Sequence, residues 1–147
     1  MKVVVQRVKE GSVTIGGNLH SNIDRGLVIL LGIAKGDVEK DATFLADKCS
    51  ALRVFEDGEG KMNLSVKDVG GSALVVSQFT LYGDAQKGNR PSFTEAARPE
   101  DAEPLYEQFL TRLRTNLGSD RVAAGVFRAM MDVHILNDGP VTIIIES

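Results

Sequence analysis

The stretch SQFTLYGD, residues 77–84, brings polar side chains to the end of an apolar run, where an oxyanion could be bound without help from an ionisable side chain. Ser77, Gln78 and Thr80 follow a strongly apolar run and precede a glycine, a pattern that favours a strand ending at a cleft. Backbone N–H groups beyond the last bond of such a strand can stabilise an oxyanion. An ordinary edge strand rich in Ser and Thr is the alternative, and spacing alone favours that alternative.

Most other catalytic and metal-binding patterns are absent from the sequence. His20 and His134 are the only histidines, and neither lies in an H-x-x-H or H-E-x-x-H pattern, which disfavours a metal site. His134 falls in an alternating run, where a packed or surface histidine is the simpler interpretation. No P-loop, dinucleotide or G-x-S-x-G motif occurs, so those enzyme classes are disfavoured. The single cysteine, Cys49, lies on an apolar helical stripe and is expected to be a buried structural thiol.

The stretch LNDGPVTIII, residues 136–145, places Gly139 and Pro140 between two strand-like runs. A turn is the simpler interpretation, because Gly tolerates unusual dihedral angles and Pro fixes φ. A cis peptide bond held for a purpose is the other. Only about 5–6% of X-Pro bonds in folded proteins are cis, so the local pattern favours the turn.

Length and composition indicate one globular domain spanning residues 1–147, with 43% hydrophobic and 25% charged residues. The net charge of −3 means that nucleic-acid contact needs a local basic patch. Lys87, Arg90 and Arg98 offer one, although from charge alone a solvated loop is the simpler interpretation. The lone cysteine, a strand-like N-terminus and the lack of a long apolar segment predict a cytoplasmic protein that does not enter a membrane.

Apolar patterning predicts an α/β domain, rich in strands, with two main helices. In the helix over residues 36–52, Asp37 is the expected N-cap. In the helix over 101–118, Asp101 is the expected N-cap, with Pro104 in the first turn and Gly118 as the C-terminal cap. A loop is expected over 84–98 and a hairpin at the glycines 16 and 17. The expected strands cover residues 2–8, 12–15, 26–33, 52–57, 72–83, 122–136 and 141–146.

Several motifs taken together resemble the D-aminoacyl-tRNA deacylase family along essentially the whole chain. They are VVSQFTLYGD, KGNRPSF, GKMNLSV and NDGPVT, supported by QRV near the start and LLGI before the first helix. S-Q-F-T-L and N-x-G-P-V-T are specific in combination. The resemblance implies a homodimer with sites at its interface. We expect no metal and no cofactor. The resemblance also implies hydrolysis of the ester between a D-amino acid and the terminal ribose of tRNA.

The resemblance assigns catalysis to Ser77, Gln78, Phe79 and Thr80. Two mechanisms stay open. Thr80 could be a nucleophile, but the sequence offers no base to activate it. Alternatively, the N–H groups of Phe79 and Thr80 stabilise the oxyanion, with help from the ribose 2′-hydroxyl and water as the final nucleophile. The second mechanism is preferred because it accounts for the scarcity of histidine.

The resemblance also assigns residues that bind substrate. Gly139 and Pro140 of one subunit reach the other's active site through a cis bond, whose two carbonyl oxygens grip the α-amino group. An L side chain would collide with this motif, whereas D-aminoacyl and glycyl esters pass. Met131 matches a methionine near the pocket. Lys87 and Arg90 belong to K-G-x-R-P-S-F and are expected at the tRNA 3′ end or the pocket wall.

Three residues depart from the family's usual pattern: Arg128, Met130 and His134. They leave the two signatures unchanged. The rival function, from a different class, is a non-catalytic module that binds aminoacyl-tRNA or a free amino acid. Such a module needs no turnover, which suits a site without ionisable groups.

Overall fold

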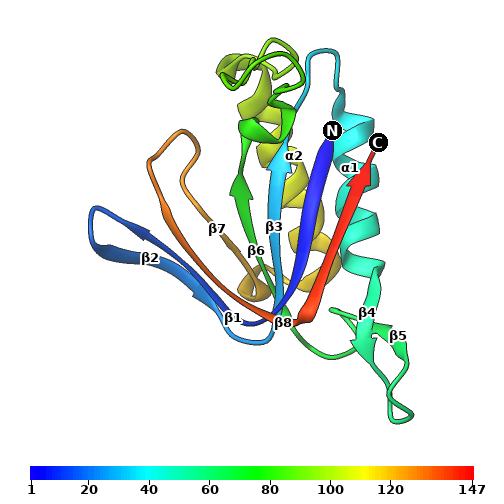
Figure 1. Ribbon diagram of the computed structural model, residues 1–147. Helices are drawn as coiled ribbons and strands as arrows, with labels where there is room; N and C mark the ends of the chain where they lie inside the picture. The colour runs from blue at the N-terminus through cyan, green and yellow to red at the C-terminus, as the bar shows by residue number, and fades with distance from the viewer.

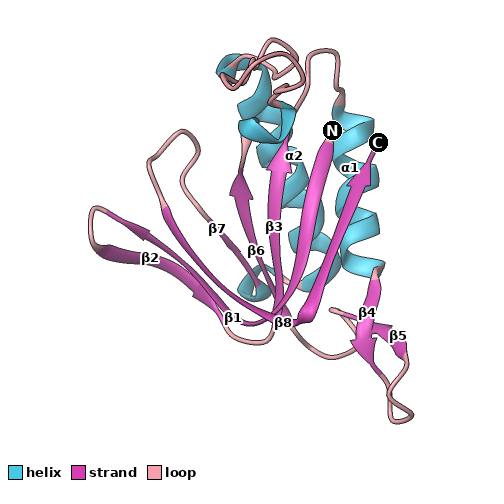
Figure 2. Cartoon of the chain, viewed as in Figure 1, coloured by secondary structure: helices cyan, strands magenta, loops and turns pink.

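A mixed sheet with both helices packed on one face forms the body of the chain (Figures 1 and 2). The computed structural model describes residues 1–147. The expected strand-rich α/β class with two main helices is confirmed. In chain order the elements are β1 (Lys2–Ile15), β2 (Asn18–Ile23), β3 (Gly26–Gly32), α1 (Glu39–Ala51), β4 (Arg53–Glu56), β5 (Met62–Ser65), β6 (Ser72–Ser77), the 3₁₀ helix η1 (Phe79–Tyr82), α2 (Pro99–Leu117), the 3₁₀ helix η2 (Ser119–Arg121), β7 (Val122–Ala124) and β8 (Asp132–Glu146).

Strand order in the main sheet is β2-β1-β3-β6-β7, and β8 pairs with β1. The predicted division into two strands, 2–8 and 12–15, is wrong, because β1 is one unbroken strand that pairs in two parts of the sheet. Its first half lies between β3 and β8, and its second half between β2 and β8, all antiparallel. The β3–β6 and β6–β7 pairs are parallel. The carboxyl ends of β3 and β6 therefore reach the same edge.

The main core lies between the sheet and the two helices. The apolar run of β3 is almost wholly buried, as its length and branched residues predict, with Leu27, Ile29 and Leu31 in this core and Val28 in a second cluster. Cys49 is fully buried, and burial raises the pKa of its thiol to about 12, so the predicted structural thiol is confirmed. A smaller apolar cluster lies under the curled ends of β1 and β2. No helix is both long enough and apolar enough to span a membrane.

The predicted strand over residues 72–83 is wrong beyond Ser77. Gln78 still donates its N–H to the carbonyl of Leu31 at 2.8 Å, but the neighbouring strand β3 ends one residue later. With no ladder to continue, the chain closes a turn in which the Leu81 N–H donates to the Gln78 carbonyl at 3.2 Å. Residues 79–82 thus form η1 rather than the end of a strand.

The predicted turn at NDGP is also wrong, because β8 continues through it from Asp132 to Glu146. Val8 of β1 pairs with Asn137 and Gln6 pairs with Thr142, so β8 carries extra residues that bulge away from β1. The Asn137 side chain closes this bulge, since its Oδ1 accepts the N–H of Val141 at 2.8 Å.

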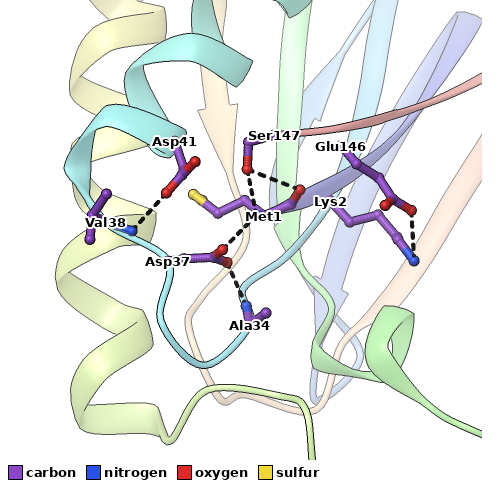
Figure 3. A network of polar contacts seen from close by, with 8 residues as sticks. All are labelled: Met1, Lys2, Ala34, Asp37, Val38, Asp41, Glu146 and Ser147. Atoms are coloured by element: carbon purple, nitrogen blue, oxygen red, sulfur yellow. Dashed lines mark hydrogen bonds and ion pairs between the residues drawn. The ribbon is translucent and has the colours of Figure 1, made fainter.

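Both predicted helix N-caps are wrong. Val38 is the N-cap of α1, and Asp41 Oδ2 accepts its N–H at 2.9 Å. Asp37 instead accepts the α-amino group of Met1 at 2.7 Å, which ties the start of β1 to the chain before α1 (Figure 3). Arg98 is the N-cap of α2, which starts at Pro99 and therefore holds Pro104 in its second turn. At the other end, the Gly118 cap is confirmed, with φ of 102°.

Candidate active site

A pocket of about 720 Å³ opens where β6 ends. Its walls come from η1, the loop before α2, the first turn of α2, and the chain between β7 and β8. Thirteen of its 18 lining residues are hydrophobic. The polar groups are few, as is usual in a ligand pocket. Those with polar side chains are Ser77, Gln78, Arg98 and Arg128.

The predicted catalytic stretch lies at this pocket. Ser77 is the last residue of β6 and is half-buried, as is Gln78, and both line the pocket together with the exposed Phe79. Thr80 is exposed and does not line the pocket. The Gln78 amide Nε2 donates to the Thr80 hydroxyl, so this hydroxyl is engaged by an amide rather than by a base.

The first N–H groups of a helix have no partner within that helix. Around η1, the N–H of Gln78 bonds to Leu31, that of Leu81 to Gln78 and that of Gly83 to Thr80. None of these bonds uses the N–H of Phe79 or Thr80. The two adjacent N–H groups at the start of η1 therefore have no backbone partner and remain available as hydrogen-bond donors.

The predicted loop over 84–98 is confirmed and closes over this end of the sheet. Two backbone hydrogen bonds join Asp84 to Ser92 within this loop, with N–O distances of 2.7 and 2.8 Å. Phe93 meets Phe79 edge to face, with ring centroids 5.1 Å apart. A Cβ at Gly83 would lie 2.9 Å from the Phe93 ring, so the glycine of the YGD sequence makes room for this aromatic pair.

None of the lining residues is His, Asp or Glu. The lining residues thus offer no general base, which weakens the version with Thr80 as the nucleophile. His134 lies on the exposed surface instead, with Nε2 3.0 Å from Oε1 of Glu10, and the simpler interpretation of this histidine is confirmed.

The Gly139–Pro140 peptide bond is cis, and both residues are exposed. Arg7 holds the segment in place from β1. Its Nε donates to the Asp138 carbonyl at 3.1 Å and lies 3.2 Å from Asp138 Oδ2, and its Nη1 donates to the Val54 carbonyl at 2.6 Å. Arg7 is only 7% exposed, so these bonds are shielded from water.

The two signature motifs do not meet within the chain. The end of β6 at Ser77 is level with Leu31 of β3, which pairs with Val3 of β1. Gly139 instead lies against Arg7, four residues further along β1. At about 3.3 Å per residue, the motifs are roughly 13 Å apart along the sheet.

The other predicted substrate-binding residues differ in position. Met131 is half-buried and lines the pocket, and a Cβ at Gly125 would lie 2.6 Å from its sulfur. Lys87 and Arg90 are exposed on the loop and do not line the pocket. Sequence reasoning gave no role to Arg7, although the QRV motif that contains it was a signal.

Comparison with known proteins identifies the family. A family model described as D-Tyr-tRNA(Tyr) deacylase matches residues 4–146. The chain belongs to this family. It is 60% identical over 147 residues to a D-aminoacyl-tRNA deacylase of Brevibacillus brevis, covering 100% of both chains. It is 57% identical to that of Thermus aquaticus, covering 100% of this chain and 95% of the relative.

Solved structures share the fold of this deacylase family member. A protein called c-Myc DNA Unwinding Element Binding Protein superposes with a TM-score of 0.95 at 48% identity, covering 100% of this chain and 99% of its own. A probable eukaryotic D-amino acid tRNA deacylase superposes with a TM-score of 0.85 over 99% of this chain and 98% of its own. At 16% identity, the second comparison concerns the fold alone.

Proposed function

We propose that this chain hydrolyses the ester bond between a D-amino acid and the terminal ribose of tRNA, releasing free D-amino acid and tRNA. The observation that carries the proposal is the pocket at the end of β6, which combines Ser77, Gln78 and Phe79 of the family's S-Q-F-T-L signature with an apolar wall. Membership of the deacylase family supports the same activity. A tRNA substrate implies action in the cytoplasm during quality control of translation.

Catalysis relies on the backbone of η1. The N–H groups of Phe79 and Thr80 stabilise the negative charge that develops on the carbonyl oxygen of the ester as water attacks the carbonyl carbon. The acyl–oxygen bond then breaks, and the ribose oxygen leaves as a hydroxyl after taking a proton. The neighbouring 2′-hydroxyl of the substrate relays protons, because the pocket lining supplies no His or carboxylate. Ser77 and the amide of Gln78 orient the ester.

Chirality is screened by Gly139 and Pro140 from a second copy. Their two carbonyl oxygens accept the α-amino group, so a D side chain points to open space and an L side chain collides with the motif. Glycine has no side chain to exclude, and glycyl-tRNA is therefore a substrate too. Met131 forms part of the pocket wall.

A homodimer follows from this arrangement, because the two motifs lie far apart along one protomer's sheet. Strand β8 supports it. β8 pairs only with β1, and its residues Leu136, Ile143 and Ile144 are 45%, 37% and 63% exposed. Apolar side chains gathered on an edge strand are typical of a surface that another chain covers.

The loop residues Lys87 and Arg90 contact the tRNA backbone outside the pocket. Both are exposed and carry positive charge, which adds affinity for phosphate without reading sequence.

The test is incubation of the purified protein with radiolabelled D-tyrosyl-tRNA, followed by measurement of both released amino acid and bound RNA. Multiple turnovers per protein molecule are expected. A protein that binds the RNA but leaves the ester intact is instead the non-catalytic binding module.

A further inference from the structure

Two arginines supply the only formal charges on the pocket wall. Arg98 and Arg128 both line the pocket, and no carboxylate lines it with them. Neither guanidinium takes part in an ion pair, in contrast to the paired guanidinium groups of Arg7 and Arg112. Both side chains are exposed. In a chain with a net charge of −3, this concentration of free positive charge at one opening distinguishes the pocket from the average surface.

The backbone at Arg128 gives no local reason for an arginine. Its φ is 66°, in the left-handed region, and it is the only residue other than glycine with a positive φ. It belongs to a tight turn in which the Ala129 N–H donates to the Val126 carbonyl at 3.1 Å. Glycine suits such a position best. The arginine therefore makes the turn less favourable, and its side chain contributes charge to the pocket rim.

Arg98 lines the pocket from the start of α2. As the N-cap of α2, its carbonyl accepts the N–H groups of Asp101 and Ala102 at 3.0 and 2.9 Å. Its side chain makes no cap bond and remains free for a ligand. The acidic residues of this first helical turn, Glu100 and Asp101, are exposed and do not line the pocket.

We propose that Arg98 and Arg128 bind phosphodiester groups of the single-stranded tRNA 3′ end and so set the depth at which the terminal ribose enters the pocket. This assignment rests on the proposed function. The ester and the ribose are neutral, so the nearest anions in the substrate are the phosphates that precede the last nucleoside. A guanidinium group matches phosphate oxygens through paired N–H donors, better than an ammonium group does.

The role is one of binding and positioning, since neither residue lies within the S-Q-F-T-L signature. Replacing either guanidinium should raise KM for D-tyrosyl-tRNA about tenfold, the effect of losing one charge-assisted hydrogen bond, with little change in kcat. Each lost phosphate contact should also make the decline of log(kcat/KM) with log[salt] shallower by about 0.7 for a single strand.

The variants are Arg98→Gln, Arg128→Gly and their combination. Arg128→Gly is chosen because glycine fits the positive φ, so the protein should fold at least as well as the unmodified chain. Arg53→Gln is the matched control. It removes an exposed arginine from β4, which lies away from the pocket (Figure 1). We expect it to leave KM and the salt slope unchanged.

Two esters separate phosphate binding from other effects: D-tyrosyl-tRNA and D-tyrosyl adenosine, which has no phosphate. The arginine variants should be impaired on the tRNA ester and match the unmodified protein on the adenosine ester. Equal impairment on both esters, or an unchanged salt slope, would overturn the phosphate assignment.

Failure of the proposed function has a different signature, because the unmodified protein would then cleave neither ester. The assignment is then tested by fluorescence anisotropy with an RNA microhelix that carries D-tyrosine through a 3′-amide. A salt slope for binding that is shallower in the double variant supports the arginines as phosphate ligands. The same salt slope in the double variant and in the unmodified protein refutes the phosphate assignment.

Discussion

The guanidinium group of Arg7 holds Asp138 at two points, its carbonyl oxygen at 3.1 Å and its carboxylate Oδ2 at 3.2 Å. Asp138 directly precedes Gly139, so a residue of β1 fixes the start of the motif proposed to screen chirality. The third bond of this guanidinium, to the Val54 carbonyl, extends the same anchor to β4. The position of the motif thus depends on packing between three strands rather than on its own sequence alone.

Replacing Arg7 by Gln should destabilise the fold strongly, because it leaves the Asp138 carboxylate and the Val54 carbonyl without their donor. We expect a loss of about 3 kcal/mol in the free energy of unfolding, measured by urea denaturation. Arg112→Gln is the control. The hydrogen bond from Arg112 likewise lowers the pKa of its partner Asp47, but the side chains of Arg112 and Asp47 are 40% and 42% exposed. That change should cost under about 1 kcal/mol. Equal losses would contradict the anchoring role.

Thr80→Ala tests which part of η1 performs catalysis. If backbone N–H groups stabilise the oxyanion, kcat for D-tyrosyl-tRNA should fall less than about tenfold, whereas loss of a true nucleophile costs roughly 10⁴-fold or more. Circular dichroism verifies the fold. A well-folded variant with only background turnover would restore Thr80 as the nucleophile.

Phe79→Pro removes one N–H group from the start of η1. Proline is tolerated at the first helical position, which Phe79 occupies directly after the N-cap Gln78. We expect kcat to fall about 10²- to 10³-fold, as when an oxyanion donor is lost. Phe79→Ala is the control, because it removes the ring and keeps the N–H. The mechanism fails if both variants have the same kcat.

Gly139→Ala should affect both stability and activity. Gly139 has φ of 130°, and a Cβ there would lie 2.9 Å from Val141 Cγ2 and 3.1 Å from Arg7 Nη2. We expect a loss of about 1–3 kcal/mol in the free energy of unfolding. Gly17→Ala separates backbone strain from crowding, since φ there is 80° but the space is open. A cost for Gly17→Ala as large as that for Gly139→Ala would show that crowding against Arg7 is unimportant.

Cys49 should make the protein less stable at alkaline pH. Its folded pKa is raised from 9.0 to about 12 by burial, so the stabilising effect of the neutral thiol is complete below about pH 9 and is lost as pH rises toward 12. Over this window the free energy of unfolding should decline by about 1.4 kcal/mol per pH unit relative to Cys49→Ala. Parallel urea curves for the two proteins across this range would contradict the burial of the thiol.

Element types were predictable where patterning is regular. The continuous apolar run of β3 indicates a buried strand, and the helical spacing of apolar residues around Cys49 indicates a helix with one buried face. The end of β6 was not predictable, because residues 78–82 have strong strand propensity and leave the sheet only where the neighbouring β3 ends. Tertiary context decided that boundary.

The site was predictable in part. Ser77, Gln78 and Phe79, which line the pocket, were identified from the S-Q-F-T-L signature. Arg7, by contrast, lies 131 positions away in sequence from Asp138, which it holds. No local pattern could connect them. The NDGP bulge likewise depends on the Asn137 side chain replacing a backbone partner, so Gly and Pro there suggested a turn instead.

The most direct test of the central claim is deacylation of matched D-tyrosyl- and L-tyrosyl-tRNA by the purified protein, without added metal. We expect rapid hydrolysis of the D-ester, with the L-ester decaying at the rate seen without protein. Equal hydrolysis of both esters would contradict the chirality screen, and survival of both would contradict the proposed enzyme.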